Sequence, residues 1–137
     1  MGEMYTERLL DHYRRPRNKG HFEEPDRSNS SAQLMAAEEY NPLCGDRVTI
    51  EARVEAGQLV QVRWDGRGCA LCLGAASILT AVAQGRPLAE LEALGEDAFL
   101  TELQSSIRPA RLKCALLPWM ALRHALFGED EWPNLER

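Results

Sequence analysis

The stretch VTIEARV at residues 48–54, followed by EAGQ at 55–58 and LVQVRW at 59–64, decides the fold. Val48, Ile50, Ala52 and Val54 alternate with polar residues, which places them on one face of a strand. The EAGQ segment has the composition of a tight turn, and the apolar run after it returns as the next strand. This region therefore predicts a hairpin inside an antiparallel sheet.

The residues before the hairpin predict one helix and one further strand. The segment TERLLDHYRRPR at 6–17 has Thr6 as an N-cap and leucines at helical spacing, and Pro16 ends the helix. Residues 17–31 are rich in turn-forming residues and predict a long irregular connection. Residues 32–39 are the candidate for the additional strand.

The residues after the hairpin predict helices only. Residues 70–84 are apolar on all sides, which predicts a buried helix that ends before Gly85 and Pro87. Two short helices with acidic outer faces are expected at 87–94 and 96–103. A final helix is expected at 111–127, ending at Gly128, and residues 129–137 form an acidic tail with little order.

This order of elements predicts an α+β protein. We expect an antiparallel three-stranded sheet packed against four to five helices, in a two-layer single domain that covers residues 1–137. Residues 1–31 would supply a helix and an irregular N-terminal region. The order does not fit a βαβ protein with a parallel sheet, because the strands are not separated by helices.

Composition and charge exclude several classes of function. The 137 residues carry a net charge of −5, which argues against nucleic acid and anionic membranes as partners. No apolar run reaches the roughly 18 residues that a membrane-spanning helix needs. The first 15 residues contain charges throughout and no apolar core of a secretory signal, so we expect a cytoplasmic protein in a reducing compartment.

Four cysteines in such a chain favour metal or thiol chemistry over disulfides. Cys44 lies in the loop NPLCGD, and Cys69 follows GRG at the step into the buried helix. Cys114 precedes Pro118 by four residues, and proline is tolerated in a first helical turn, so we expect Cys114 at or just before the start of the final helix. Helix starts lower the pKa of thiols, and Lys113 adds a positive charge that would stabilise a thiolate.

Asp46 completes a candidate site with Cys44, Cys69 and Cys114. Gly45 allows a sharp turn that points the side chains on both sides of it toward one ion. Three thiolates and one carboxylate suit tetrahedral Zn²⁺, or iron with an incomplete sulfur shell. The carboxylate is the weakly held ligand of that set, and we interpret it as an exchangeable corner.

Structural and redox alternatives stay open for several of these residues. A free cysteine is often only a small buried hydrophobe, above all Cys72 within the apolar helix, and Asp46 alone fits a solvated turn. Cys69 and Cys72 also form a CxxC at a strand-to-helix step, as in thiol–disulfide oxidoreductases. The joint metal site is favoured because its four members flank Gly or Pro at the ends of elements, where core cysteines have no reason to lie. His12 is expected on the surface or facing a partner.

The chain resembles the iron–sulfur cluster scaffold family of the IscU, SufU and NifU N-terminal type. The resemblance spans nearly the whole chain and rests on short motifs in order: DHY at 11–13, PRNKG at 16–20, NPLCGDR at 41–47, GRGC at 66–69 and RLKC at 111–114. The Asn-Pro-x-Cys-Gly-Asp-Arg loop and Lys113 are similar to SufU. The separation of Cys69 from Cys114 is similar to IscU, because SufU proteins carry an insertion of about twenty residues there (compare loop-length tolerance).

The resemblance implies a fold, a site and partners. It implies an α+β fold with a three-stranded sheet and one site, formed by Cys44, Asp46, Cys69 and Cys114, that binds Zn²⁺ as isolated or a transient [2Fe–2S] cluster. It implies a cysteine desulfurase as sulfur donor and apo iron–sulfur proteins as acceptors. The N-terminal region is a candidate for self-association.

Two functional hypotheses follow. The first is a scaffold that receives sulfur, assembles a [2Fe–2S] cluster on the four residues and passes it to apo-proteins. The second is a zinc-dependent sulfurtransferase that activates the desulfurase. Cys44 and Cys114 are both candidates for the persulfide acceptor.

Overall fold

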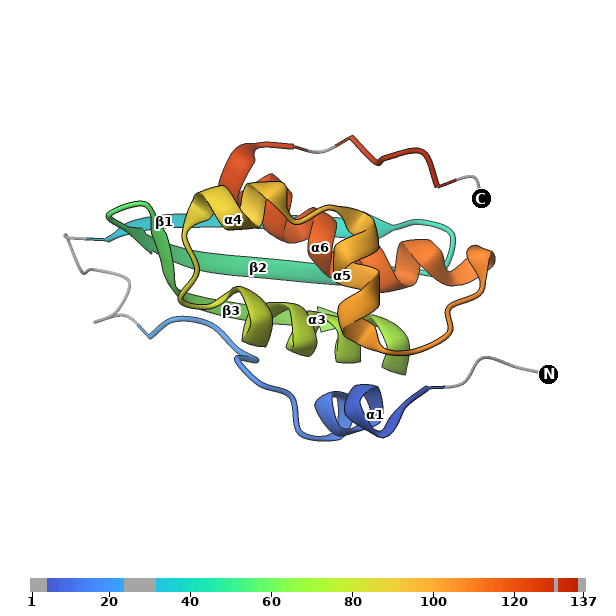
Figure 1. Ribbon diagram of the computed structural model, residues 1–137. Helices are drawn as coiled ribbons and strands as arrows, with labels where there is room; N and C mark the ends of the chain where they lie inside the picture. Colours follow the sequence, from blue (N-terminus) through green and yellow to red (C-terminus); the bar gives the residue numbers. More distant parts are fainter. Residues whose placement is uncertain (1–4, 24–31, 130, 136–137) are drawn as a thin grey trace.

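A computed structural model describes residues 5–23, 32–129 and 131–135, and Figure 1 shows their arrangement. The described part of the chain has one three-stranded sheet and five α-helices, as predicted. In chain order the elements are α1 (Glu7–Arg14), β1 (Gln33–Asn41), β2 (Asp46–Glu55), β3 (Gln58–Arg67), α3 (Ala70–Ala83), α4 (Leu88–Ala93), α5 (Glu96–Leu103), the 3₁₀ turn η1 (Pro109–Arg111) and α6 (Leu112–Phe127).

The sheet is antiparallel in the order β1-β2-β3. Val48, Ile50, Ala52 and Val54 are all buried on one face, which confirms the alternation predicted for the hairpin. The strands extend beyond the predicted ranges, since β1 continues to Asn41 and β2 already begins at Asp46. Only the β1–β2 turn therefore separates the two strands, and it places Cys44 at one end of the sheet.

The helices cover the apolar face of the sheet (Figure 1). α6 packs across β1 and β2, and α3 packs along β3 and against α6. α3 is buried nearly all round, as its composition predicted, because α1 lies on the side of α3 that faces away from α6. The core thus lies between the sheet and the α3–α6 pair, and the first turns of both helices reach the same end of the sheet as the β1–β2 turn.

The start of α6 corrects one argument from the sequence. The helix begins at Leu112, so Pro118 is its seventh residue and lies inside it, not in its first turn. Cys114 nevertheless lies in the first turn. Because proline has no N–H, the carbonyl of Cys114 receives no hydrogen bond from the residue four positions later.

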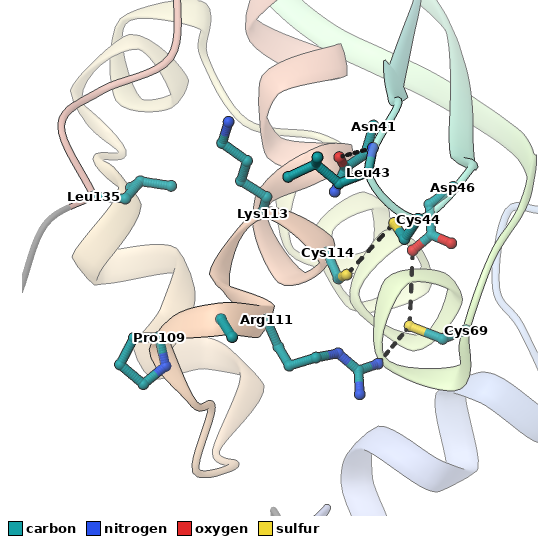
Figure 2. Close-up of a pocket in the computed structure, with 11 residues that line it drawn as sticks. Asn41, Leu43, Cys44, Asp46, Cys69, Pro109, Arg111, Lys113, Cys114 and Leu135 are labelled. Carbon is teal, nitrogen blue, oxygen red and sulfur yellow. Dashed lines mark hydrogen bonds between the residues drawn. The ribbon is translucent and has the colours of Figure 1, made fainter.

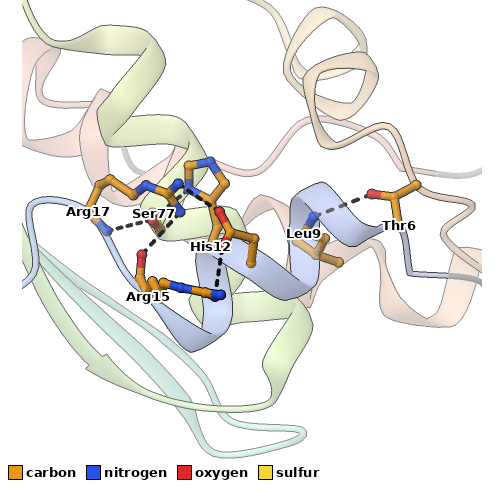
Figure 3. A network of polar contacts seen from close by, with 7 residues as sticks. Thr6, Leu9, His12, Arg15, Arg17 and Ser77 are labelled. Carbon is orange, nitrogen blue, oxygen red and sulfur yellow. Dashed lines mark hydrogen bonds and ion pairs between the residues drawn. The ribbon is translucent and has the colours of Figure 1, made fainter.

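α1 is attached to α3 by a buried polar network, shown in Figure 3. Thr6 caps α1 as predicted, since its side chain accepts from the N–H of Leu9. His12 was expected on the surface or facing a partner, but it is buried, with Nδ1 2.7 Å from Oγ of Ser77 on α3. The backbone N–H of Arg17 also donates to this Oγ, at 2.8 Å. Burial of its helix face against α3 is what overrides the exposed position suggested for His12.

Two segments outside the helices and strands were predicted to be irregular, one near each end of the chain. Of the irregular connection at 17–31, residues 24–31 lie outside the described residues. In the C-terminal tail, Trp132 and Leu135 pack against the core, which differs from the weakly ordered tail that was predicted. Within the described ranges, every helix is too short or too polar to cross a bilayer.

Candidate metal centre

Three separate elements bring the predicted site residues to one place, as Figure 2 shows. Cys44 lies in the β1–β2 turn and Asp46 begins β2, Cys69 is the N-cap of α3, and Cys114 lies in the first turn of α6. The Sγ atoms of Cys44 and Cys114 are 3.9 Å apart, and the Cys69 thiol lies 3.8 Å from Oδ2 of Asp46. Ligand atoms of Cys44, Asp46 and Cys114 all lie within 4.8 Å of one another.

The β1–β2 turn is built to present Cys44. The Asn41 side chain accepts from the N–H of Leu43 at 3.1 Å, and the Asn41 carbonyl accepts from Cys44 and from Gly45. Gly45 has a φ of +79°, which L-residues adopt only with strain. The turn leaves Cys44 exposed, and Leu43 is 86% exposed beside it.

Gly68 determines where the Asp46 carboxylate can lie. A Cβ atom at Gly68 would be 2.8 Å from Cγ of Asp46, closer than real Cβ contacts occur. The Asp46 side chain is buried against this glycine, directly before Cys69. The second glycine of the GRG motif therefore lets the Asp46 side chain approach the backbone before Cys69, which leaves room for a carboxylate in the site.

Arg111 is a site residue that the sequence reasoning missed. It precedes α6, and its Nη2 donates to Sγ of Cys69 at 2.9 Å. Burial opposes its charge, but hydrogen bonds to Cys69 and Cys114 raise the pKa of Arg111 above its already high value. Its position one turn before Cys114 in the RLKC motif could have indicated that Arg111 lies in the site. A fixed cation thus faces the thiols from within the pocket.

Lys113, the residue expected to stabilise a thiolate, points elsewhere. Its Nζ lies 5.5 Å from the centre of the Trp132 ring, and Figure 2 shows its side chain directed away from the Cys114 thiol. Side chains of adjacent residues on a helix face different directions, and this explains the divergence. In this arrangement Arg111 occupies the place that was predicted for the lysine.

The Cys114 thiol has the opposite pKa shift from the one predicted. Burial, followed by the negative charge of Cys69, raises the pKa of Cys114 to about 12, although the Arg111 hydrogen bond works against this. Cys114 as a whole is 6% exposed, so the loss of solvation outweighs the effect of the helix start on the pKa. Without a metal, Cys114 is therefore a protonated thiol at neutral pH.

Cys72 lies outside this group. It is fully buried, and burial raises its pKa far above the usual range of a thiol. All four cysteines are free, so Cys69 and Cys72 do not form the disulfide that a CxxC redox protein would use. The structure thus gives Cys72 the surroundings of a small core residue.

The four donors line a pocket of about 530 Å³ at the end of the sheet. Its remaining walls come from the β1–β2 turn, the region before α6 and the C-terminal segment: Asn41, Leu43, Pro109, Ala110, Arg111, Lys113 and Leu135. Cys44, Asp46 and Cys114 form the close group, and Cys69 joins it through Asp46. Sulfur and carboxylate donors of this kind suit Zn²⁺ or iron. Four anionic ligands around a divalent ion leave a net charge of −2, which the Arg111 cation partly offsets.

The family of this chain is decided by a match that covers most of its length. Residues 4–129 match the model of the NifU-like N-terminal domain. The chain belongs to this family. The resemblance based on the cysteine-containing motifs is thereby confirmed, and the NifU-like domain of this chain includes every element from α1 to α6.

Relatives of this NifU-like domain carry two kinds of name. The zinc-dependent sulfurtransferase SufU of Bacillus subtilis is 26% identical over 144 residues, covering 93% of this chain and 92% of that protein. The iron–sulfur cluster assembly scaffold protein IscU of Escherichia coli is 28% identical over 123 residues, covering 89% and 91%. The SufU alignment is longer than this whole chain, so SufU has residues that this chain lacks.

Solved structures share the fold. A SufU scaffold protein of Fervidobacterium islandicum has a TM-score of 0.68 at 23% identity, covering 89% of this chain and 96% of that one. The N-terminal part of a NifU-like protein of Brucella abortus also reaches 0.68, at 21% identity, covering 89% and 91%. At these identities the similarity establishes the α+β fold of the NifU-like domain.

Proposed function

We propose that this NifU-like domain is a scaffold on which a [2Fe–2S] cluster is assembled from iron and from the sulfur of a cysteine desulfurase, for transfer to apo iron–sulfur proteins. The observation that carries the proposal is the convergence of three thiols and one carboxylate, from three separate elements, in one open pocket. A reducing compartment, the cytoplasm, would keep these thiols free.

Cys44 is the proposed acceptor of sulfur. Its thiol is exposed, whereas Cys114 is buried and protonated, and Cys69 already accepts a hydrogen bond from Arg111. The Cys44 thiolate attacks the outer sulfur of the desulfurase persulfide, and a new S–S bond forms as the old one breaks. The desulfurase cysteine leaves as a thiolate. Each transferred sulfur then needs two electrons from an electron-transfer protein to become sulfide.

The exposure of Cys44 also favours a second candidate function, a zinc-dependent sulfurtransferase. The donor set fits Zn²⁺, which Cys44, Asp46, Cys69 and Cys114 would hold and which would keep the sulfurs deprotonated. The exposed Cys44 is the ligand best placed to leave and accept sulfur. Buried Asp46 and Cys114 and half-buried Cys69, with Arg111, would keep their arrangement.

A desulfurase assay tests the proposal and separates the two functions. The chain is mixed with a cysteine desulfurase and cysteine, either as the zinc form without iron or as the metal-free form with ferrous iron and a reductant. A scaffold develops the absorption of a [2Fe–2S] cluster in the iron arm. A sulfurtransferase stimulates desulfurase turnover in the zinc arm and develops no cluster in the iron arm.

Two cysteine variants provide the matched comparison. Cys44→Ser removes the proposed acceptor and should abolish persulfide on the chain, as detected by mass spectrometry. Cys72→Ser changes a thiol outside the pocket and should retain it. Equal persulfide formation by the Cys44 variant and the unchanged chain contradicts the assignment of Cys44.

A further inference from the structure

Residues 131–135 lie beyond the family domain yet form part of its pocket. The family match ends at residue 129, and Leu135 nevertheless lines the wall of the pocket that contains the four donors. Trp132 and Leu135 are both half-buried against the core. Figure 1 shows the C-terminal segment returning along the helical side of the molecule after α6. The segment thus lies outside the matched residues and touches the functional end of the domain.

This segment also holds Lys113. The Lys113 ammonium lies over the Trp132 ring, 5.5 Å from its centre, a distance at which a cation is attracted to the face of an indole. Lys113 directly precedes Cys114, but Figure 2 shows its side chain extending toward the side of the pocket where Leu135 lies. The nearest lysine to the thiols therefore points away from them, as its place on α6 already favours, and its ammonium is held at the C-terminal segment.

A sulfur donor must enter the space that this segment borders. Transfer of a persulfide sulfur requires the reacting atoms to approach within roughly 3–3.5 Å. The donor cysteine has to reach a pocket whose walls include Lys113 and Leu135. A protein whose active-site cysteine enters this pocket comes close to the C-terminal segment at Leu135.

We propose that residues 131–135 are a displaceable strap, which a docking cysteine desulfurase moves aside and which, once moved, releases Lys113 toward the incoming persulfide. This inference rests on the proposed function, because it names the regulation of the same pocket. The strap has neither helix nor strand among its described residues, and its two anchoring side chains are only half-buried. A segment without helix or strand and with half-buried anchors can be exchanged for a partner surface.

A shortened chain tests the strap. A variant that ends at Glu129 lacks the strap but keeps the ion pair of Arg123 with Glu129, at 2.6 Å. It should bind the desulfurase at least threefold more tightly than the full chain, because the partner no longer has to displace the segment. Trp132→Ala should show a smaller increase, and Glu131→Gln, an exposed residue of the same segment, should show none. Binding is measured by titration and folding by thermal unfolding.

Lys113 provides the second readout. In the shortened chain, Lys113→Met should slow sulfur transfer from the desulfurase severalfold, and an unchanged rate of transfer would overturn the release of Lys113. Hydrogen exchange should show residues 131–135 losing protection when the desulfurase binds, while the turn at 41–46 gains protection.

The outcomes separate the strap from the proposed function. Equal or weaker desulfurase binding by the shortened chain, together with a lowered unfolding temperature, would mean that the segment only completes the fold, and it overturns the strap alone. If neither chain binds the desulfurase and the turn at 41–46 gains no protection, both the proposed function and the strap are overturned.

Discussion

Asp46 differs in kind from the other three donors of the pocket. Its oxygen is a harder ligand than a thiolate, and its position depends on the absence of a side chain at Gly68. Arg111 adds a fixed positive charge at Cys69. At the scale of residues the pocket combines three thiols, one carboxylate and one cation.

Removing the oxygen ligand should lengthen the life of a bound cluster. In Asp46→Ala the corner of the site that exchanges most readily is lost, so transfer of the [2Fe–2S] cluster to an apo-protein should slow severalfold. The decay of cluster absorption after mixing with apo-ferredoxin measures this. Asp65→Asn, an exposed carboxyl change on β3 outside the pocket, serves as control. Faster loss of the cluster from the Asp46 variant than from the unchanged chain would contradict the exchangeable corner.

Adding one methyl group next to Asp46 should weaken metal binding. In Gly68→Ala the new Cβ forces the Asp46 carboxylate to move, and changes that reposition a ligand typically cost about 10–100-fold in metal affinity. Competition with a chromophoric zinc chelator gives the affinity. Gly95→Ala is the matched control, since a Cβ there meets nothing within 4 Å. Unchanged zinc affinity in the Gly68 variant would show that Asp46 is not held by this contact.

At the scale of elements, α1 is held on α3 by polar groups as well as by packing. Ser77 is fully buried on α3 and bonds both His12 and the backbone of Arg17, which leads into the segment beside β3. Cys69 is the N-cap of α3. The network therefore supports the helix that positions one ligand of the site.

Loss of the Ser77 hydroxyl should destabilise the fold. Ser77→Ala leaves the N–H of Arg17 and the ring nitrogen of His12 without their partner, and a buried unsatisfied polar group costs about 1–3 kcal/mol. Urea unfolding of the metal-free protein measures the loss. The control is Thr101→Ala on the exposed face of α5, because surface substitutions usually change the free energy of unfolding by no more than about 0.5 kcal/mol. An equal free energy of unfolding for the two variants would show that the network does not stabilise the fold.

At the scale of the whole molecule, folding is linked to pH through this same network. Burial, reinforced by the charges of Arg17 and Arg8, lowers the pKa of His12 below 6.5. The unfolded chain then binds a proton at His12 more readily than the folded one. The stability that depends on neutral His12 is complete above pH 6.5 and is lost as the pH falls toward the folded pKa.

The free energy of unfolding should therefore fall below pH 6.5, by at most about 1.4 kcal/mol per pH unit for this group. His21 acts in the opposite sense, because its hydrogen bond with Glu51 raises its pKa and makes its contribution largest at low pH. The difference between the unchanged chain and His12→Asn isolates the His12 effect. Urea unfolding at pH 7.5 and 5.5 checks it, and an equal pH dependence of both chains would contradict it.

The sequence alone determined the elements and the candidate ligands. Alternation in β2, the apolar α3 and the helix ends at Thr6 and Gly128 depend on local patterns, which a single segment contains in full. The joint placement of Cys44, Asp46, Cys69 and Cys114 was predicted from Gly and Pro at element ends and from the family resemblance. Strand and helix boundaries were less accurate, as Asp46 and Pro118 show, because pairing and packing can extend an element beyond its local signal.

Only the tertiary structure decided the surroundings of these groups. Burial reversed the expected pKa shift of Cys114 and placed His12 inside, and it depends on elements that are distant in sequence. The choice of Arg111 over Lys113 as the cation facing the thiols follows from side-chain direction at the start of α6 and from Trp132, nineteen residues after the lysine. Charge and solvation act through space, so the pKa and exposure of a side chain depend on which distant segments pack against it.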